Sequence, residues 1–121
     1  MIVSNESEEM YLKTIYILSG QLESVRLVDV AASLGYAKSS VSNALKELIK
    51  KDLIIYGTDK KIVLTSSGLN EAKKVNQRYE DIKAFLIKIG LDKNSAEMDS
   101  CKLEHVISDN LYEVIKRNIN R

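Results

Sequence analysis

The sequence contains no proline, no tryptophan, five glycines and one cysteine in 121 residues. With no proline and so few glycines, little in the chain interrupts a helix, so we expect long helices. A single cysteine excludes an intramolecular disulfide and, with no signal-peptide pattern at the N-terminus, favours the reducing cytoplasm. No apolar run reaches the roughly 20 residues of a membrane-spanning helix. We therefore expect a soluble, cytoplasmic, mainly helical protein with no membrane partner.

The charges almost cancel over the whole chain but are unevenly distributed along it. The formal net charge is +1, yet residues 26–61 carry seven Lys and Arg against four Asp and Glu, whereas residues 1–25 carry one against four. A basic middle third is typical of a small DNA-binding module, although an excess of this size is weak evidence by itself. Whether this basic segment binds DNA must therefore be judged from the helices predicted for it.

The basic segment has the pattern of a helix-turn-helix. A short apolar helix at residues 28–34 ends at Gly35, and a second helix is predicted at residues 38–51. The second helix has an apolar stripe and an opposite face of hydroxyls, an amide and lysines, which suits a recognition helix that reads base edges and holds phosphates. The alternative is an ordinary solvated amphipathic helix. The predicted DNA-binding residues are Arg26, Lys38, Ser39, Ser40, Ser42, Asn43, Lys46, Lys50 and Lys60.

A β-hairpin is predicted directly after the recognition helix. Residues 53–56 and 62–65 are rich in β-favouring side chains and are separated by a turn with Lys60 and Lys61 at its edge. Two strands alone are marginally stable, so the hairpin must pack on the preceding helices. This arrangement predicts a wing whose lysines contact phosphate.

The last part of the chain is predicted to be helical and to form a dimer. A long helix at residues 66–89 is followed by two shorter helices, and their apolar stripes exceed what one copy can bury. The expected fold is therefore mainly α, with a winged helix-turn-helix DNA-binding domain at residues 1–65 and a helical dimerisation domain at residues 66–121. A two-fold homodimer would read a palindrome in adjacent major grooves.

The segment from Cys101 to His105 offers three metal-ligating side chains within five residues. On a helix, Glu104 and His105 fall within about 60° of Cys101, on one face. Sulfur, carboxylate oxygen and imidazole nitrogen together suit a transition-metal ion better than calcium or magnesium. The alternative is a solvated polar face beside an idle, half-buried thiol.

Several motifs together resemble one known family. They are Glu9–Tyr16, Val28–Gly35 with Ser39–Ser42, Leu64–Gly68, Ile89–Asp92 and, above all, Cys101–Asp109. With these segments the chain resembles, over nearly its whole length, the iron-dependent, diphtheria-toxin-repressor-like metalloregulators, which include the manganese transport regulators. The middle motifs occur in many winged helices, whereas the last motif combined with the first helix is specific to this family.

The resemblance implies a metal-dependent transcriptional repressor that binds palindromic operator DNA as a homodimer. In the iron-responsive branch the principal site takes a Met from the first helix and the Cys, Glu and His of the late motif, which match Met10, Cys101, Glu104 and His105. The manganese-responsive branch has a carboxylate at the position of Met10 and another acid at that of Lys13. Because a thioether is soft and neutral, Fe²⁺ is expected, with Mn²⁺, Co²⁺, Ni²⁺ and Zn²⁺ as alternatives.

The chain departs from its relatives at a second, ancillary metal site. The family builds that site from two His and a Glu, and the corresponding residues here are Tyr79, Lys83 and Glu97. Lys83 would repel a cation, so we expect the site to be absent or rebuilt from Glu80, Glu97 or Asp99. The third, SH3-like domain of some relatives is not expected either, because the sequence stops before it.

Other functions remain open at this point. The chain could be a winged-helix regulator without metal control, with Cys101 inert or redox-responsive, or a metal-dependent interaction protein that no longer reads DNA. It could also be an enzyme with Cys101 as nucleophile and His105 as base. We identify no oxyanion hole, glycine-rich loop or substrate pocket, so neither a catalytic residue nor a small organic substrate is predicted.

Overall fold

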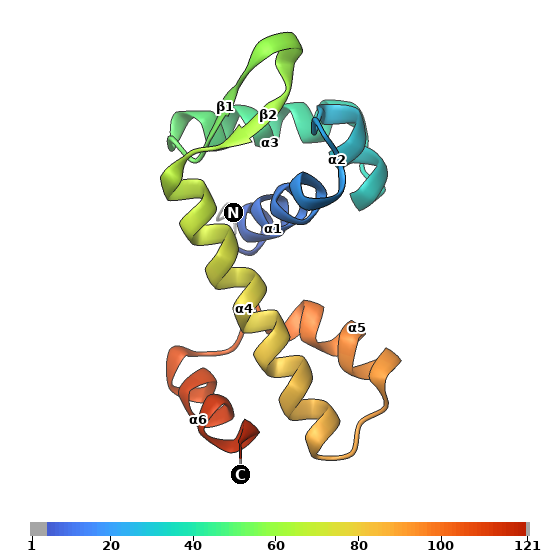
Figure 1. The fold of residues 1–121 in the computed structure, drawn as a ribbon, viewed down its shortest axis with the longest axis vertical. Helices are drawn as coiled ribbons and strands as arrows, with labels where there is room; N and C mark the ends of the chain where they lie inside the picture. Colours follow the sequence, from blue (N-terminus) through green and yellow to red (C-terminus); the bar gives the residue numbers. More distant parts are fainter. Residues whose placement is uncertain (1–4, 121) are drawn as a thin grey trace. The chain divides into compact units, whose positions relative to one another are not determined.

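The computed structural model describes the backbone of residues 5–120 and the side chains from residue 7 onward. Within residues 5–120, no helix combines the length and the apolarity needed to cross a bilayer. The winged helix-turn-helix and the predominance of helix are as predicted (Figure 1). The elements are α1 (Asn5–Gln21), α2 (Leu27–Leu34), α3 (Lys38–Lys50), β1 (Ile54–Tyr56), η1 (Thr58–Lys60), β2 (Ile62–Leu64), α4 (Ser66–Lys88), α5 (Lys93–Leu103) and α6 (Asp109–Ile119).

The chain forms two compact units, of which the first ends at Lys73 and the second begins at Lys74. The predicted domain boundary after residue 65 coincides with the start of α4, whereas the units divide within this helix. The first turns of α4 therefore pack with the DNA-binding elements, and the rest of α4 belongs to the C-terminal unit.

The N-terminal unit is built on an apolar core formed by α1, α2, α3 and the hairpin. The strands are antiparallel, with Ile54 opposite Leu64. The hairpin is tied to the loop after α1 because the N–H of Ile62 donates to the carbonyl of Val25 at 2.7 Å. The predicted dependence of the wing on the helices is thus confirmed. The core residues are Tyr11, Leu12, Ile15, Val25, Val30, Ala31, Val41, Leu45, Leu48, Ile54, Ile62 and Ala72.

The turn between α2 and α3 depends on Gly35. This residue adopts φ 72° and ψ 28°, and its N–H donates to the carbonyl of Ala31 at 2.8 Å. At the other end of α2, the carboxylate of Asp29 accepts the N–H of Arg26 at 2.9 Å. A left-handed C-cap favours glycine because it has no Cβ to clash. The helix predicted at residues 28–34 therefore agrees with the observed α2 to within one residue at each end.

Gly68 lies where the first turn of α4 passes the backbone between α3 and β1. The hydroxyl of Thr65 accepts the N–H of Gly68 at 3.0 Å, and the N–H of Thr65 donates to the carbonyl of Leu53 at 3.0 Å. A Cβ on residue 68 would lie 1.9 Å from that carbonyl oxygen. Because the clash is with backbone, relieving it requires moving α4 or the strand.

We expect Gly68→Ala to lower the free energy of unfolding by about 2–3 kcal/mol, the usual cost of forcing extra atoms into a packed site. Urea unfolding followed by circular dichroism measures this loss. Gly20→Ala is the matched control, since nothing lies within 4 Å of a Cβ there and the residue is in α1. It should gain up to about 1 kcal/mol from helix propensity. Equal stabilities for the two variants would contradict the assigned contact.

In the C-terminal unit, hydrogen bonds and an ion pair connect α6 and the turn before it to α4. Arg78 donates to the carboxylate of Asp109 at 2.8 Å and to the carbonyl of Ile107 at 3.3 Å, and its guanidinium lies 4.6 Å from the centre of the Tyr112 ring. The phenol of Tyr112 donates to the carboxylate of Asp81. Burial, reinforced by Asp81, raises the pKa of Tyr112 to about 12, so this donor keeps its proton at neutral pH.

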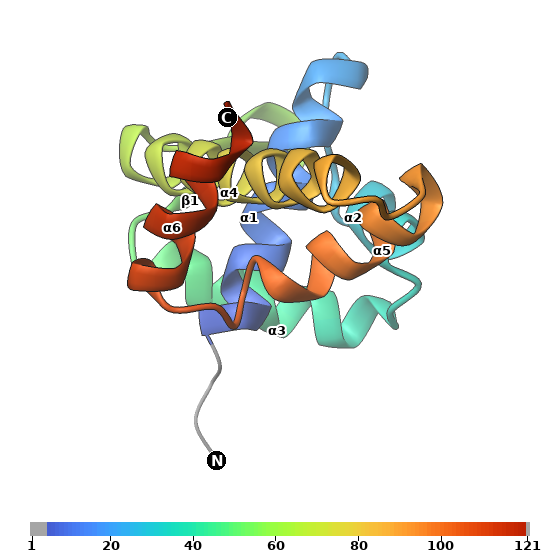
Figure 2. The ribbon, with the colours of Figure 1, turned by 90° about the horizontal axis from the view of Figure 1, so that it is seen from below.

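The remaining contacts of the C-terminal unit leave much apolar surface uncovered. Figures 1 and 2 show α5 and α6 on different sides of the C-terminal half of α4. Ser108 caps α6 by accepting the N–H of Leu111 at 3.1 Å. The exposed large apolar side chains of the C-terminal unit are Ile87, Ile89, Met98, Val106, Leu111 and Val114.

Candidate metal centre and nucleic-acid interface

The segment predicted to ligate metal does not form one regular helix. The sequence pattern predicted a helix through Ile107, but α5 ends at Leu103. The N–H of Glu104 still donates to the carbonyl of Ser100 at 3.0 Å, whereas that of His105 donates to the carbonyl of Lys102 at 3.4 Å. This shift to three-residue spacing tightens the backbone. The prediction was wrong here because the chain must reverse direction before α6 begins.

The turn after α5 buries its polar side chains and exposes an apolar one. The side chains of Glu104 and His105 are 0% and 1% exposed, and Glu104 Oε1 lies 3.1 Å from His105 Nε2. Val106, the next residue, is 64% exposed. The alternative of a solvated polar face is therefore wrong. Burying a carboxylate is costly unless it is paired, so this arrangement needs a reason beyond packing.

The separation of these two atoms suits a shared metal ion. Bonds of about 2.1 Å meeting at angles of about 90–109° place two donor atoms about 3.0–3.4 Å apart. A carboxylate and an imidazole are both ligands that transition-metal ions accept. The donor pair therefore fits half of the coordination sphere that the resemblance implies.

The other two predicted ligands lie on helices outside this turn. Cys101 is half-buried in the last turn of α5, and Met10 is half-buried on α1 in the N-terminal unit. Among the side chains that the structure describes, no group of three or more His, Cys, Asp or Glu is gathered closely enough to hold an ion. The structure thus brings together Glu104 and His105 of the four predicted ligands.

The residues at the ancillary positions do not fit a second metal ion. Tyr79 and Lys83 lie one turn apart on α4, and Glu97 lies on α5. The Nζ of Lys83 is 5.1 Å from the centre of the Tyr79 ring and 2.8 Å from the carboxylate of Glu80. An ammonium has no lone pair to donate while protonated, so it cannot ligate a cation. The absence of a second metal ion at these positions remains a prediction from the chemistry of Tyr79 and Lys83.

Four predicted DNA-binding residues line one hollow of about 480 Å³ in the N-terminal unit. It lies between the start of α2, the middle of α3 and the hairpin turn. Arg26 closes one side, because its Nε donates to the carbonyl of Asp59 at 3.3 Å. Cations from three separate elements around one hollow can hold a nucleic-acid phosphate. The lining residues are Arg26, Leu27, Val28, Ser42, Lys46, Tyr56, Asp59 and Lys60.

The other predicted DNA-binding residues lie on the outer face of α3. Lys50 makes a weak, exposed ion pair with Glu47 at 3.4 Å, which leaves its ammonium accessible. The sequence reasoning overlooked two aromatic side chains near this face, Tyr36 and Tyr56, which are 50% and 42% exposed. Their position, with Tyr36 in the turn before α3 and Tyr56 at the end of β1, was the available signal. The exposed residues of α3 are Lys38, Ser39, Ser40, Asn43, Lys46, Glu47 and Lys50.

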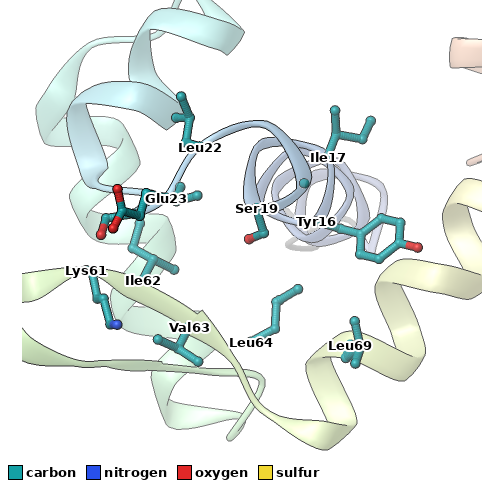
Figure 3. Close-up of a pocket in the computed structure, with 13 residues that line it drawn as sticks. Tyr16, Ile17, Ser19, Leu22, Glu23, Lys61, Ile62, Val63, Leu64 and Leu69 are labelled. Atoms are coloured by element: carbon teal, nitrogen blue, oxygen red, sulfur yellow. The ribbon is translucent and has the colours of Figure 1, made fainter.

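A second hollow in the N-terminal unit, of about 650 Å³, is mostly apolar. Figure 3 shows it between the end of α1, strand β2 and the first turn of α4, with Tyr16, Leu64 and Leu69 facing it. Glu23 and Lys61 are the charged residues in its lining. Lys61, a wing lysine predicted to contact phosphate, lines this hollow, whereas none of the four predicted metal ligands does.

The comparisons with known proteins agree with this geometry. Residues 4–62 match the family model described as iron dependent repressor, N-terminal DNA binding domain. Residues 65–121 match the one described as iron dependent repressor, metal binding and dimerisation domain. The two models together cover nearly the whole chain.

Individual relatives lead to the same group of proteins. An HTH-type transcriptional regulator of Methanocaldococcus jannaschii is 34% identical over 114 residues, which cover 93% of this chain and 91% of that protein. The regulator MntR of Bacillus subtilis is 32% identical over 113 residues, which cover 93% and 80%. The solved manganese regulator SloR is 26% identical with a TM-score of 0.81, covering 99% of this chain and 55% of that one. The chain thus spans about half the length of this solved relative.

Proposed function

Because the chain belongs to the iron-dependent repressor family, whose members are transcriptional regulators rather than enzymes, we propose that it is an Fe²⁺-responsive repressor that binds palindromic operator DNA as a homodimer. The observation that carries this proposal is the buried pair of Glu104 and His105, 3.1 Å apart, in the region that matches the metal-binding domain of the family. Operator DNA lies in the cytoplasm, so the protein would act there.

We propose that Met10, Cys101, Glu104 and His105 hold the ion. The bound ion would supply the positive charge that a buried carboxylate favours. Met10 argues for Fe²⁺ over Mn²⁺, because a thioether is a poor ligand for a hard ion. The solved relative SloR is described as a manganese regulator, so this chain would differ from that protein in its metal preference.

Met10 and the Cys101–His105 segment belong to different units of the chain. An ion bound by both would link the DNA-reading helices to the dimerisation region. Metal would then favour the arrangement of two recognition helices that fits DNA, by binding that arrangement more tightly than others.

The homodimer would use the exposed apolar surface of the C-terminal unit. Met98, Leu111 and Val114 are 66%, 46% and 43% exposed. A monomer rarely leaves large apolar side chains grouped on short helices uncovered. A two-fold pair of chains would present two copies of α3 to two half-sites, which is why the operator is expected to be palindromic.

Metal removal tests this function. We expect the protein to bind a palindromic operator from the region upstream of its own gene about 5–150-fold more tightly with excess Fe²⁺ than with a chelator, the usual range of such couplings. Anaerobic fluorescence anisotropy at fixed salt measures both affinities, and a single half-site serves as the control for dimeric reading. Identical affinities with Fe²⁺ and with chelator would instead favour a regulator without metal control.

A further inference from the structure

Lys83 lies in surroundings that resemble those of a bound cation. Its ammonium is 2.8 Å from the carboxylate of Glu80 and lies over the face of the Tyr79 ring, with its Nζ 5.1 Å from the ring centre. The side chain is 23% exposed, so most of it is removed from water. The hydrogen bond with Glu80 raises the pKa of Lys83, and the charge of Glu97 adds to this effect, so the side chain remains an ammonium. An aromatic face and nearby carboxylates are what a cation prefers.

The charges that act on Lys83 come from two helices of the C-terminal unit, α4 and α5. Glu97 lies on α5 and its charge acts on both Lys83 and Tyr79, which lie on α4. Tyr79 also feels the charge of Cys101, one of the proposed ligands. Two like charges confined at short range repel, so the position holds one cation at a time.

We propose that the ammonium of Lys83 is a tethered cation that takes the place of a second metal ion, so that each chain binds one regulatory ion instead of two. The inference rests on the proposed function, because the remaining ion is the one assigned to Glu104 and His105. The donor set at the ancillary positions supports it, since Tyr79 and Lys83 replace the imidazole and carboxylate expected of the family. Lys83 thereby determines the metal stoichiometry.

The test compares the wild type with Lys83→Met, His105→Ala and the double variant. Met keeps the length of the side chain and removes its charge, which leaves Glu80 and Glu97 free to accept an added cation. Bound Mn²⁺ per chain is measured by equilibrium dialysis at about 1 mM free ion, the weak end of carboxylate-rich sites. We expect one ion for the wild type, two for Lys83→Met, none for His105→Ala and one for the double variant.

Because Lys83 and His105 are changed separately and together, the role of Lys83 is tested independently of the metal ion assigned to Glu104 and His105. If Lys83→Met binds the same number of ions as the wild type, or if the wild type already binds two, the inference is wrong. If His105→Ala binds as many ions as the wild type, His105 is not a ligand of the ion. The effect of Lys83 is still measured by comparing Lys83→Met with the wild type. Adding Glu97→Gln to Lys83→Met should remove the extra ion.

Control variants distinguish the loss of one specific ammonium from a general loss of charge. Lys93→Met changes an exposed lysine at the start of α5 and should leave the number of bound ions at the wild-type value. Circular dichroism confirms that each variant folds. If Lys83→Met is unfolded, Lys83→Gln replaces it, because an amide retains polarity and removes the charge.

Discussion

His105→Ala should abolish the stimulation of DNA binding by Fe²⁺ while leaving the metal-free affinity for DNA close to that of the wild type. The imidazole is the nitrogen donor of the pair with Glu104, and its side chain is 1% exposed. Mutation of a residue that only supports a ligand typically lowers metal affinity about 10–100-fold. Removal of a ligand itself should therefore lower metal affinity by more than this. The coupling of about 5–150-fold in operator affinity should disappear with it.

Two measurements on the same protein check this result. Isothermal titration under anaerobic conditions gives the affinity for Fe²⁺, and fluorescence anisotropy gives the affinity for operator DNA. Val106→Ala is the matched control, because Val106 follows His105 directly but is 64% exposed, and it should change neither quantity. Retention of full Fe²⁺ stimulation by His105→Ala would exclude the proposed centre.

Met10→Ala extends the same test to the first helix. A thioether is a weaker ligand than an imidazole, so this variant should show the same pattern as His105→Ala with a smaller loss of metal affinity. If Met10 contributes only to packing on α1, the stability of the protein should fall while Fe²⁺ affinity remains unchanged. The two outcomes are distinguished by titration and by urea unfolding.

Lys46→Ala should weaken binding to all DNA sequences and reduce the dependence of binding on salt. Lys46 shares its hollow with Arg26 and Lys60, a concentration of positive charge that suits a phosphate. Each lost phosphate contact lowers the slope of log affinity against log salt by about 0.9. Binding to operator and to unrelated DNA, measured between about 50 and 200 mM salt, gives this slope.

Two further variants serve as controls for Lys46→Ala. Lys73→Ala removes an exposed lysine of α4 that does not line the hollow, and it should leave the salt slope unchanged. Asn43→Ala, on the exposed face of α3, should alter the sequence preference rather than the slope, because an amide reads base edges. An unchanged slope for Lys46→Ala would show that the nucleic-acid face was assigned wrongly.

The sequence by itself determined the elements of the fold, because local patterns govern where helices begin and end. The apolar stripe of α3 placed that helix to within one residue, and Gly35 marked the end of α2. The hydroxyls of Thr65 and Ser108 accept backbone N–H groups at the starts of α4 and α6, as side chains of this type commonly do before a helix. The family was also recognisable from the sequence, through the resemblance of several motifs and above all of Cys101–Asp109.

Only the tertiary structure decided which side chains of those elements are buried and which of them meet. Periodicity could not show that the turn after α5 encloses Glu104 and exposes Val106, because that choice depends on what packs against the turn. The contact of Arg26 with Asp59 joins residues 33 positions apart, and the ammonium of Lys83 is influenced by Glu97 on another helix. Contacts between distant residues leave no local pattern in a sequence, and the fold alone brings them together.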